Sequence, residues 1–299
     1  MLRRHFQETH YDAAIPVGLE MAALFERHRT SLPVPTMLPP SESFRTALDK
    51  KRTFEHAAAL GIPIPKTLAA ANWRELGLPV VFKHPRTGAW IVRSAPEVEA
   101  VARRIESGTE THIAQEYIPG ENGFGYFGFF QNGRETAYFM HERLMQYPRE
   151  GGPSVVARSI HDTRLRELGK TLLASLDWHG AAMVEFKRHE GNGEFYLMEI
   201  NPKLWGSLDL AIVSGCNFPV WIANALIDGS SPPATSYPDG VTYQWLLPVG
   251  LKAALRYPEF RGAILRNVIS SKIKSDWRWS DPLPTFAELY SMLANAVKR

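Results

Sequence analysis

One segment near residue 190 places two acidic residues where they could bind a metal ion together. The stretch AAMVEFKRHEGNGEFYLMEINPKLWG contains two apolar runs joined by Gly191-Asn192-Gly193, the pattern of a β-hairpin. With the turn centred on Asn192, Glu185 lies opposite Glu199, at a Cβ separation of roughly 4.5–5.5 Å. Asn201 shares the face of Glu199, because side chains alternate along a strand. Carboxylate and amide oxygens are hard ligands, which suits Mg²⁺ or Mn²⁺ and does not suit zinc.

The same hairpin has a second interpretation. Like charges opposed on a sheet are unfavourable unless a cation lies between them. In the alternative, the turn is off by one residue, one glutamate faces water, and the other pairs with an arginine or lysine such as Lys203. The hairpin alone leaves both interpretations open.

Two lysines are candidates for binding an anion. Lys83 closes the apolar run at residues 79–82, and Lys50 opens a helix directly after Asp49. Each is either an ordinary solvent-facing charge or a point charge held for a bound anion. Residues 78–94 predict a hairpin with an exposed turn, and the turn residues Thr87 and Gly88 would let backbone amides approach a phosphate.

The first forty residues resemble a fragment of a domain. Residues 11–17 predict a short buried strand, residues 19–28 an amphipathic helix, and the Pro-rich residues 32–40 a linker. One strand and one helix cannot bury both their faces. This piece therefore docks on the rest of the chain, or an N-terminal domain is lost or supplied by a partner.

Caps and turn residues predict the other elements. Asp49 in the first turn, Gly61 just past the end and Pro63 as a stop mark a helix. The remaining predictions are helices at 96–106, 165–176, 252–257 and 285–297, strands at 112–118 and 241–249, and an aromatic hairpin that turns at Asn132-Gly133.

Composition narrows the class of protein. The chain has 299 residues, of which 44% are hydrophobic and 22% charged, as in a globular protein of about two domains. The net charge of +3 arises from mixed signs, so nucleic acid is not implied. A single cysteine, Cys216, fits a reducing compartment. We find neither a membrane-spanning run nor a signal peptide, and expect a cytoplasmic protein with no nucleic-acid or membrane partner.

Taken in order, these segments resemble the ATP-grasp superfamily, in particular its carboxylate-amine ligase branch. The resemblance covers residues 49–226 and rests on DKKRTFEHAAALGIPIP, VVFKHPRTG, AQEYIPGENGFG, AAMVEFK and LMEINPKLWGSLDLA. It implies an α+β fold in which two lobes with antiparallel sheets enclose the nucleotide. The expected parts are a remnant of an N-terminal domain with a linker (1–40), a small lobe (41–115), a large lobe with the metal site (116–236) and a C-terminal extension (237–299) whose role is not readable.

The resemblance also implies roles for individual residues. Lys50 and Lys83 correspond to contacts with the ATP phosphates, with Lys83 also near the adenine. The hinge whose backbone reads the adenine is Glu116-Tyr117-Ile118, and Ile118 packs on the adenine face. Glu121 corresponds to the ribose-binding acid, or is a solvated loop charge. The implied magnesium ligands are Glu185, Glu199 and Asn201.

Cations on the substrate side are candidates for catalysis. Lys203 occupies a position that is usually arginine in the family, where it helps to orient an acyl phosphate; lysine keeps the charge and loses the bidentate fork. His141, Arg143 and Arg149 border the Gly151-Gly152 loop. They suit binding of a carboxylate or an acyl phosphate, or they belong to a solvated loop.

The resemblance implies an enzyme that joins a small-molecule carboxylate to an amine, using Mg-ATP and an acyl-phosphate intermediate. Two alternatives remain from the sequence. One is a nucleotide-binding subunit without ligase activity of its own, as a homodimer or with a partner chain completing the N-terminal domain. The other is a small-molecule kinase that uses the same nucleotide site.

Overall fold

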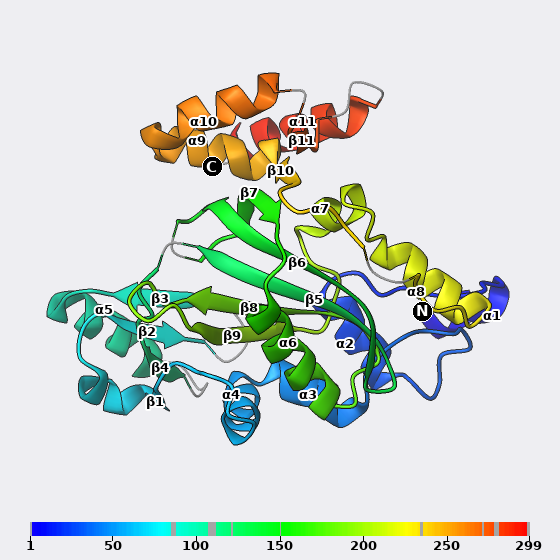
Figure 1. Ribbon diagram of the computed structural model, residues 1–299, viewed down its shortest axis with the longest axis horizontal. Helices are drawn as coiled ribbons and strands as arrows, with labels where there is room; N and C mark the ends of the chain where they lie inside the picture. Colours follow the sequence, from blue (N-terminus) through cyan, green and yellow to red (C-terminus); the bar gives the residue numbers. More distant parts are fainter. Residues whose placement is uncertain are drawn as a thin grey trace.

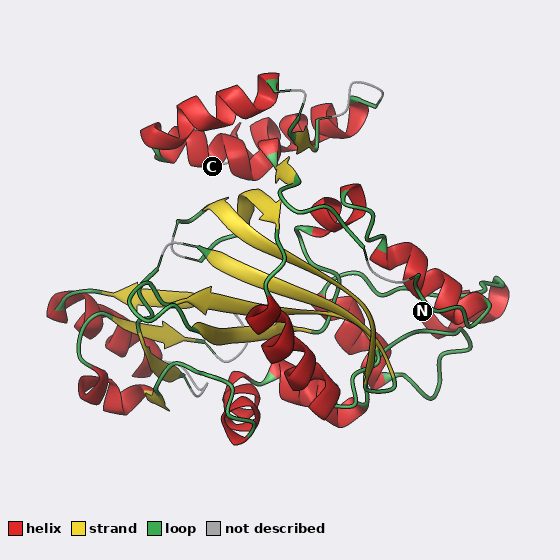
Figure 2. Cartoon of the chain, viewed as in Figure 1, coloured by secondary structure: helices red, strands yellow, loops and turns green. Residues whose placement is uncertain are grey.

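Two separate β-sheets organise the chain, with helices on both faces of the larger one (Figures 1 and 2). The α+β class with antiparallel sheets is therefore confirmed. The computed structural model describes residues 2–84, 88–106, 112–120, 122–149, 151–233, 236–270, 272–277 and 281–297. Within these residues, no helix is both long and apolar enough to cross a membrane.

The small sheet has four antiparallel strands in the order β1 (Thr67–Ala69), β4 (Ile113–Glu116), β2 (Val80–Lys83) and β3 (Ala89–Val92). The predicted hairpin at 78–94 is confirmed by the pairing of β2 with β3. Helix α5 (Ala95–Glu106) follows β3, and a 3₁₀ helix, η1 (Ala70–Leu76), follows β1. Val80, Phe82, Val92 and Val98 form the buried core of this unit.

The large sheet has seven strands. Their order is β11 (Lys274–Ser275), β10 (Thr242–Gln244), β7 (Ser154–Ser159), β6 (Arg134–Gln146), β5 (Gly123–Gln131), β8 (Gly180–Arg188) and β9 (Phe195–Asn201). All neighbours are antiparallel except β10 and β11. The predicted aromatic hairpin is β5–β6, and its turn residues Asn132 and Gly133 both have positive φ, as a tight hairpin turn requires.

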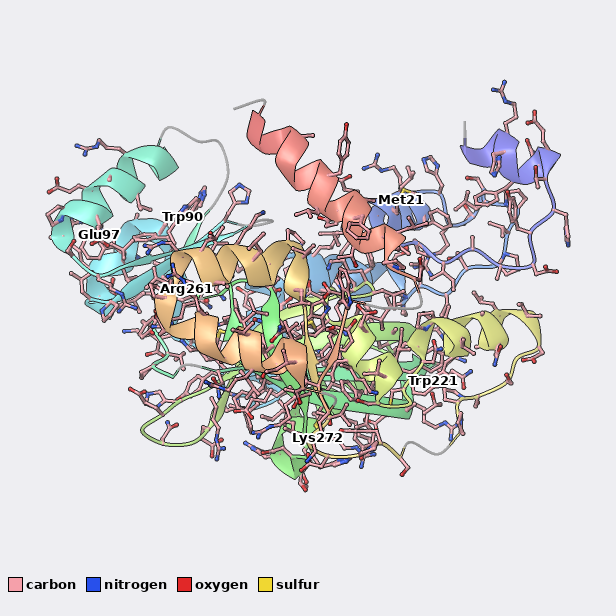
Figure 3. All side chains as sticks on the ribbon, turned by 90° about the horizontal axis from the view of Figure 1, so that it is seen from above. Met21, Trp90, Glu97, Trp221, Arg261 and Lys272 are labelled. Atoms are coloured by element: carbon pink, nitrogen blue, oxygen red, sulfur yellow. The ribbon has the colours of Figure 1, made fainter. Side chains whose placement is uncertain are left out.

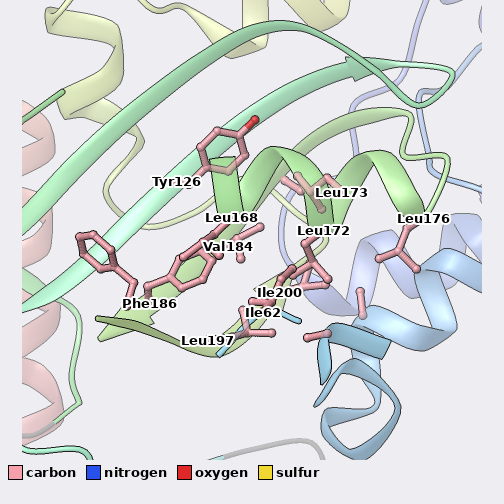
Figure 4. Close-up of a cluster of buried hydrophobic side chains, with 14 of the residues drawn as sticks. Ile62, Tyr126, Leu168, Leu172, Leu173, Leu176, Val184, Phe186, Leu197 and Ile200 are labelled. Carbon is pink, nitrogen blue, oxygen red and sulfur yellow. The ribbon is translucent and has the colours of Figure 1, made fainter. Parts of the chain in front are cut away.

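One face of the large sheet is covered by helix α6 (Thr163–Ser175). Asp162 caps this helix by accepting the Leu165 backbone N–H at 2.9 Å, which satisfies one free donor of the first turn. Leu168, Leu172 and Leu173 point from α6 into a core with side chains of β5, β8 and β9 (Figure 4). Leu165 belongs to the same core. The predicted helix at 165–176 is confirmed, and it fixes the strands that carry the two glutamates.

Helices α3 (Ser41–Leu48) and α4 (Lys50–Ala59) extend this layer beside β9. The Asp49 side chain accepts the Arg52 N–H at 3.1 Å, so Asp49 is the N-cap of α4 rather than a first-turn residue. Phe54 and Ala57 bury one side of α4 in the core shared with the large sheet. This packing places Lys50, the first residue of α4, next to the end of β9.

The strand predicted at residues 11–17 is wrong. The segment is irregular, and Tyr11 and Val17 are 39% and 66% exposed. Ala14 donates a backbone hydrogen bond to Pro35 at 2.9 Å, and a proline-rich partner lacks the N–H groups for a ladder. The helix predicted at 19–28 is α2 (Leu19–Arg27), with Ala22 and Phe25 buried. The N-terminal segment therefore docks on the rest of the chain, where Ile15 and Met37 pack on the core of the large sheet.

The second face of the large sheet carries an aromatic core covered by α7 (Leu208–Val213) and α8 (Phe218–Ile227). Phe127, Phe139 and Trp205 pack together in this core, with Phe127 and Trp205 ring centroids 4.3 Å apart. Neither helix was predicted.

Three α-helices follow β10 within the described residues and form a layer above its edge of the sheet (Figure 1): α9 (Leu251–Arg256), α10 (Pro258–Ile269) and α11 (Leu283–Val297). Figure 3 shows this layer from above, with Arg261 on it. The predictions at 252–257 and 285–297 correspond to α9 and α11, whereas α10 was missed. Helix α10 begins with Pro258, a residue that is favourable at the first helical position. Pro258 therefore ends one helix, α9, and begins the next, α10, although the sequence indicated only the end of a helix there.

Two helical glycines make opposite predictions for alanine substitution. A Cβ at Gly169 in α6 would overlap the ring of buried Tyr126, whereas a Cβ at Gly262 in α10 would approach only Arg266 Nη1, at 3.5 Å. We expect Gly169→Ala to lower the free energy of unfolding by about 1–3 kcal/mol through overpacking. Gly262→Ala should raise it by up to about 1 kcal/mol through helix propensity. Urea unfolding of both variants measures this contrast, and a stabilised Gly169→Ala protein would contradict the packing.

Candidate active site

Glu185 and Glu199 are directly opposed across β8 and β9, as predicted. The route to this pairing differs from the simple hairpin. Near the turn, Arg188 pairs with Phe195 and Phe186 with Leu197, which is one residue out of the predicted register. The turn is therefore shifted by one residue from the predicted position. Met198 is then an extra residue on β9, a β-bulge that shifts the register back and brings Glu199 opposite Glu185. Without the bulge, Glu199 would face the opposite side of the sheet.

Asn201 completes the oxygen cluster at the end of β9. Its Nδ2 donates to Glu199 Oε1 at 2.8 Å, and the residue pairs with Met183 on β8. The carbonyl of the bulged residue Met198 accepts a hydrogen bond from Lys83 Nζ at 3.3 Å. The bulge therefore links β9 of the large sheet to β2 of the small sheet.

Arg143 supplies the strongest contact to the acidic pair. Its Nη1 and Nη2 donate to Glu185 Oε1 and Oε2 at 2.8 and 2.6 Å, a bidentate geometry. The sequence left Lys203 as a possible partner of a glutamate, and Arg143 takes this place. Lys50 Nζ lies 4.0 Å from Glu199 Oε2. Each glutamate thus has its own cation, which offsets the repulsion between two carboxylates in a partly buried place.

A glycine on the intervening strand lets Arg143 reach Glu185. Arg143 lies on β6 and Glu185 on β8, with β5 between them. A Cβ at Gly123 of β5 would lie 3.3 Å from both Cδ and Nη1 of Arg143, which is closer than an ordinary van der Waals contact. The absence of a side chain there gives the guanidinium a path across the strand.

Lys83 is buried at 8% exposure although it ends a strand. Burial is the main cause that lowers its pKa from 10.5 to about 8; the Glu199 carboxylate opposes this shift, and Lys50 adds to it. The Lys83 ammonium also lies 5.2 Å from the centre of the Phe54 ring. The sequence left open whether this lysine is a solvent-facing charge, and the burial excludes that reading.

The acidic pair and its cations open into one cleft of about 710 Å³ that residues of both sheets line. The predicted site residues that line it are Lys50, Lys83, Gly88, Glu116, Tyr117, Ile118, Arg143, Glu185, Glu199, Asn201 and Lys203. Thr87 and Glu121 lie outside the described residues. Among the described lining residues, lysines and arginines outnumber glutamates, so the cleft favours a polyanion.

The connection between the sheets carries the predicted hinge. Ile118 is buried, and Glu116 Oε1 accepts the Lys66 backbone N–H at 2.8 Å. The Tyr117 ring contacts two cations, with Arg93 Cζ 5.1 Å and Lys187 Nζ 4.6 Å from its centre. Neither Arg93 nor Lys187 was singled out from the sequence, because cations stacked on an aromatic ring carry no local sequence signal.

His141 does not line the cleft with Arg143 and Arg149. It is fully buried and its ring packs edge-on against Phe127, with centroids 4.7 Å apart. Burial, followed by the charge of Arg143, lowers the pKa of His141 well below its usual 6.5. His141 is therefore a neutral core residue rather than a group that binds a substrate anion.

The oxygen cluster has the composition of a magnesium site. It offers two carboxylates and one amide oxygen, and the described residues contain no cluster of three or more His, Cys, Asp or Glu side chains suited to a metal ion. Arg143 donates one hydrogen bond to each oxygen of Glu185. Each carboxylate oxygen has a second lone pair, so Glu185 can pair with Arg143 and still contribute a ligand. The residues present fit Mg²⁺ or Mn²⁺.

Comparison with solved structures decides the fold. The biotin carboxylase of Campylobacter jejuni, solved as a β,γ-ATP complex, aligns with a TM-score of 0.65 at 17% identity, over 80% of this chain and 59% of that chain. The chain has the ATP-grasp fold. Residues 140–247 also match the model of a family described as ATP-grasp in the biosynthetic pathway with Ter operon.

Two other solved structures with the ATP-grasp fold are similar. The biotin carboxylase domain of 2-oxoglutarate carboxylase from Hydrogenobacter thermophilus, solved with MgADP and bicarbonate, has a TM-score of 0.61 at 15% identity, over 75% of this chain and 54% of that chain. An L-amino acid ligase from Bacillus licheniformis has a TM-score of 0.61 at 19% identity, over 75% of this chain and 58% of that chain. The chain spans less than two thirds of each of the three proteins. No curated protein gives a significant sequence match.

The burial of Lys83 in this ATP-grasp cleft predicts a cost in stability. The pKa of Lys83 is about 8 in the folded chain, against 10.5 for an ordinary lysine. Between these pH values the unfolded chain binds the proton more tightly, so the free energy of unfolding decreases as the pH falls from 10.5 to 8. Below pH 8 both states are protonated and the full cost of the buried charge is present. We expect Lys83→Met to raise the free energy of unfolding by about 1–3 kcal/mol at pH 7. This gain should shrink between pH 8 and 10.5, as the wild-type lysine loses its proton.

Urea unfolding at neutral and alkaline pH tests this expectation. Lys51→Met is the matched control. It makes the same substitution at a lysine whose side chain is 69% exposed, so no burial penalty is removed there. A Lys83→Met protein that is less stable than wild type at pH 7 would show that the buried ammonium is better compensated than its pKa indicates.

Proposed function

We propose that the chain is an ATP-dependent carboxylate-amine ligase that forms an amide or peptide-like bond through an acyl phosphate. The observation that carries this proposal is the acidic pair of β8 and β9, which meets three cations in a cleft between the two sheets of an ATP-grasp fold. The similar proteins are carboxylases and an amino acid ligase, two of them solved with adenine nucleotides, which supports the same class for this chain.

The nucleotide would lie with its adenine against the hinge and its phosphates toward the acidic pair. Backbone groups of residues 116–118 would read the adenine edge, and Ile118 would pack on its face. Lys50 and Lys83 would neutralise phosphate oxygens, with Lys83 also near the adenine. Glu121 would bind the ribose, and the turn that contains Thr87 and Gly88 would cover the phosphates and exclude water.

The metal ion would be held by Glu185, Glu199 and Asn201. A metal ion held by these residues would supply positive charge that offsets the negative charge developing in phosphoryl transfer. The chain's own cations would share this work. Arg143 Nε is buried and has no hydrogen-bond partner among the described residues, so Arg143 would contact a substrate oxygen through its two Nη groups, which also pair with Glu185.

In the proposed reaction, a carboxylate oxygen of the acid attacks the γ-phosphorus, and the bond to the ADP oxygen breaks. The amine nitrogen then attacks the carbonyl carbon of the acyl phosphate, inorganic phosphate leaves, and the amine loses a proton. Lys203 and Arg143 would hold the acid and the acyl phosphate in line with the nucleotide. The chain supplies position and charge rather than a covalent nucleophile, as phosphoryl transfer requires.

Glu199→Gln tests the metal site without a large change in shape. We expect ADP release to fall about 100-fold or more, because an amide cannot replace an anionic ligand at the point where phosphate charge develops. Stability should change little, because relief of the repulsion with Glu185 is offset by the loss of attraction to Lys50 and Lys83. Coupled measurement of ADP, with Mn²⁺ binding followed by electron paramagnetic resonance, reads the two effects separately.

Glu190→Gln is the control for this experiment. Glu190 is exposed in the turn between the same two strands and does not line the cleft, so both readouts should match the wild type. Wild-type ADP release and Mn²⁺ binding in Glu199→Gln would exclude Glu199 as a ligand.

Hydroxylamine distinguishes the ligase from the two alternatives. An acyl phosphate reacts with hydroxylamine to give a hydroxamate, so Mg-ATP, an acid substrate and hydroxylamine should yield hydroxamate in a 1:1 ratio to ADP. A kinase would instead accumulate a stable phosphorylated product that needs no amine. A nucleotide-binding subunit without ligase activity would bind Mg-ATP and release no ADP with any acid.

A further inference from the structure

The cleft continues beyond the acidic pair to a wall that the C-terminal helices help to build. Phe260 of α10 lines the cleft, as do Leu144 and Met145 at the end of β6. Phe260 and Met145 pack against one hydrophobic cluster that includes Val155 of β7. The extension whose role the sequence did not reveal therefore contributes directly to the substrate side of the cleft.

Arg149 fastens the neighbouring loop to α10. Its Nη2 lies 2.7 Å from Glu259 Oε1, and its backbone N–H donates to the Tyr257 hydroxyl at 3.3 Å. Its guanidinium lies 5.1 Å from the centre of the Phe260 ring. Gln146 Nε2 donates to the Arg149 carbonyl at 2.5 Å. Phe260 is therefore held at the cleft by two sets of contacts: those of Arg149 and those of the hydrophobic cluster that contains Val155.

Some cations of the cleft are already in ion pairs, and others are free to pair with a ligand. Arg149 is already paired with Glu259, and Arg143 is paired with Glu185. Lys203 is half-buried and has no ion-pair partner among the described residues. Two other lysines of the cleft also have no ion pair among the described residues, but Lys83 donates to the Met198 carbonyl and Lys187 lies 4.6 Å from the centre of the Tyr117 ring. A substrate carboxylate in this cleft would therefore find an uncommitted positive charge at Lys203, on the segment that directly follows the acidic strand.

Two further apolar side chains line the cleft. Trp205, two residues after Lys203, lines the cleft from the aromatic core, and Met183 of β8 lies beside Asn201. Apolar contact area in a preformed pocket favours an apolar group on the ligand. A short acid such as acetate would leave this surface in contact with water.

We infer that the acid substrate carries a bulky apolar or aromatic group, which packs against Met145, Trp205 and Phe260 while its carboxylate pairs with Lys203. This inference rests on the proposed function and specifies its substrate class. Phe260 would act as a specificity-determining residue supplied by the C-terminal helices, and Arg149 as a positioning residue that holds the loop against it.

The test compares acids that differ only by a phenyl group: propanoate with 3-phenylpropanoate, and alanine with phenylalanine. For the full-length chain with Mg-ATP, we expect KM in ADP release to be about tenfold lower for the phenyl acids. Phe260→Ala should raise KM for the phenyl acids about tenfold, with the KM for ATP and for the short acids unchanged. Phe260→Leu should restore most of the loss, because it retains apolar contact area.

Phe286→Ala is the matched control, since Phe286 lies on α11, is 55% exposed and does not line the cleft. Equal KM values for phenyl and short acids, or a Phe260→Ala change that affects ATP as much as the acids, would overturn the inference while the ligase proposal stands. If none of the acids stimulated ADP release, the ligase proposal would be refuted. Calorimetry of 3-phenylpropanoate against propanoate, with Mg-ADP present, would then still decide whether the apolar wall selects its ligand.

Discussion

Repulsion between two opposed carboxylates is the constraint around which this ATP-grasp cleft is arranged. Glu185 and Glu199 face each other on neighbouring strands, an arrangement that is unfavourable unless positive charge is brought close. Arg143 reaches Glu185 from two strands away, and Lys50 reaches Glu199 from the start of α4. Lys83 approaches from the other sheet and binds the backbone of β9. Elements far apart in the sequence thus meet at one pair of acids.

The sequence predicts the partners in this cluster better than it predicts the path of the chain. The turn residues and apolar runs correctly placed the two glutamates opposite each other. They could not reveal the bulge at Met198, because the bulge is stabilised by a lysine about 115 residues away and leaves no signal in the local pattern. Two features cancelled here: a turn shifted by one residue and a bulge that shifted the register back.

Other differences from expectation have similar tertiary causes. Residues 11–17 have the composition of a strand, but a proline-rich segment is their backbone partner, so no ladder forms. His141 has the type and position of an anion-binding residue, yet it faces Phe127 in the core. The reach of Arg143 depends on a glycine in the intervening strand, and Phe260 depends on a helix that starts at a proline. In each case a neighbour distant in sequence determines what the residue does.

Tyr117 lies where the chain passes from the small sheet to the large one. Arg93, which follows β3 of the small sheet, and Lys187, on β8 of the large sheet, both lie against the ring of Tyr117. A cation that lies within about 6 Å of an aromatic ring is attracted to the electron-rich face of that ring. One uncharged side chain therefore joins a cation of each sheet beside the chain connection between them, and this contact adds to the tie that Lys83 makes to the backbone of β9.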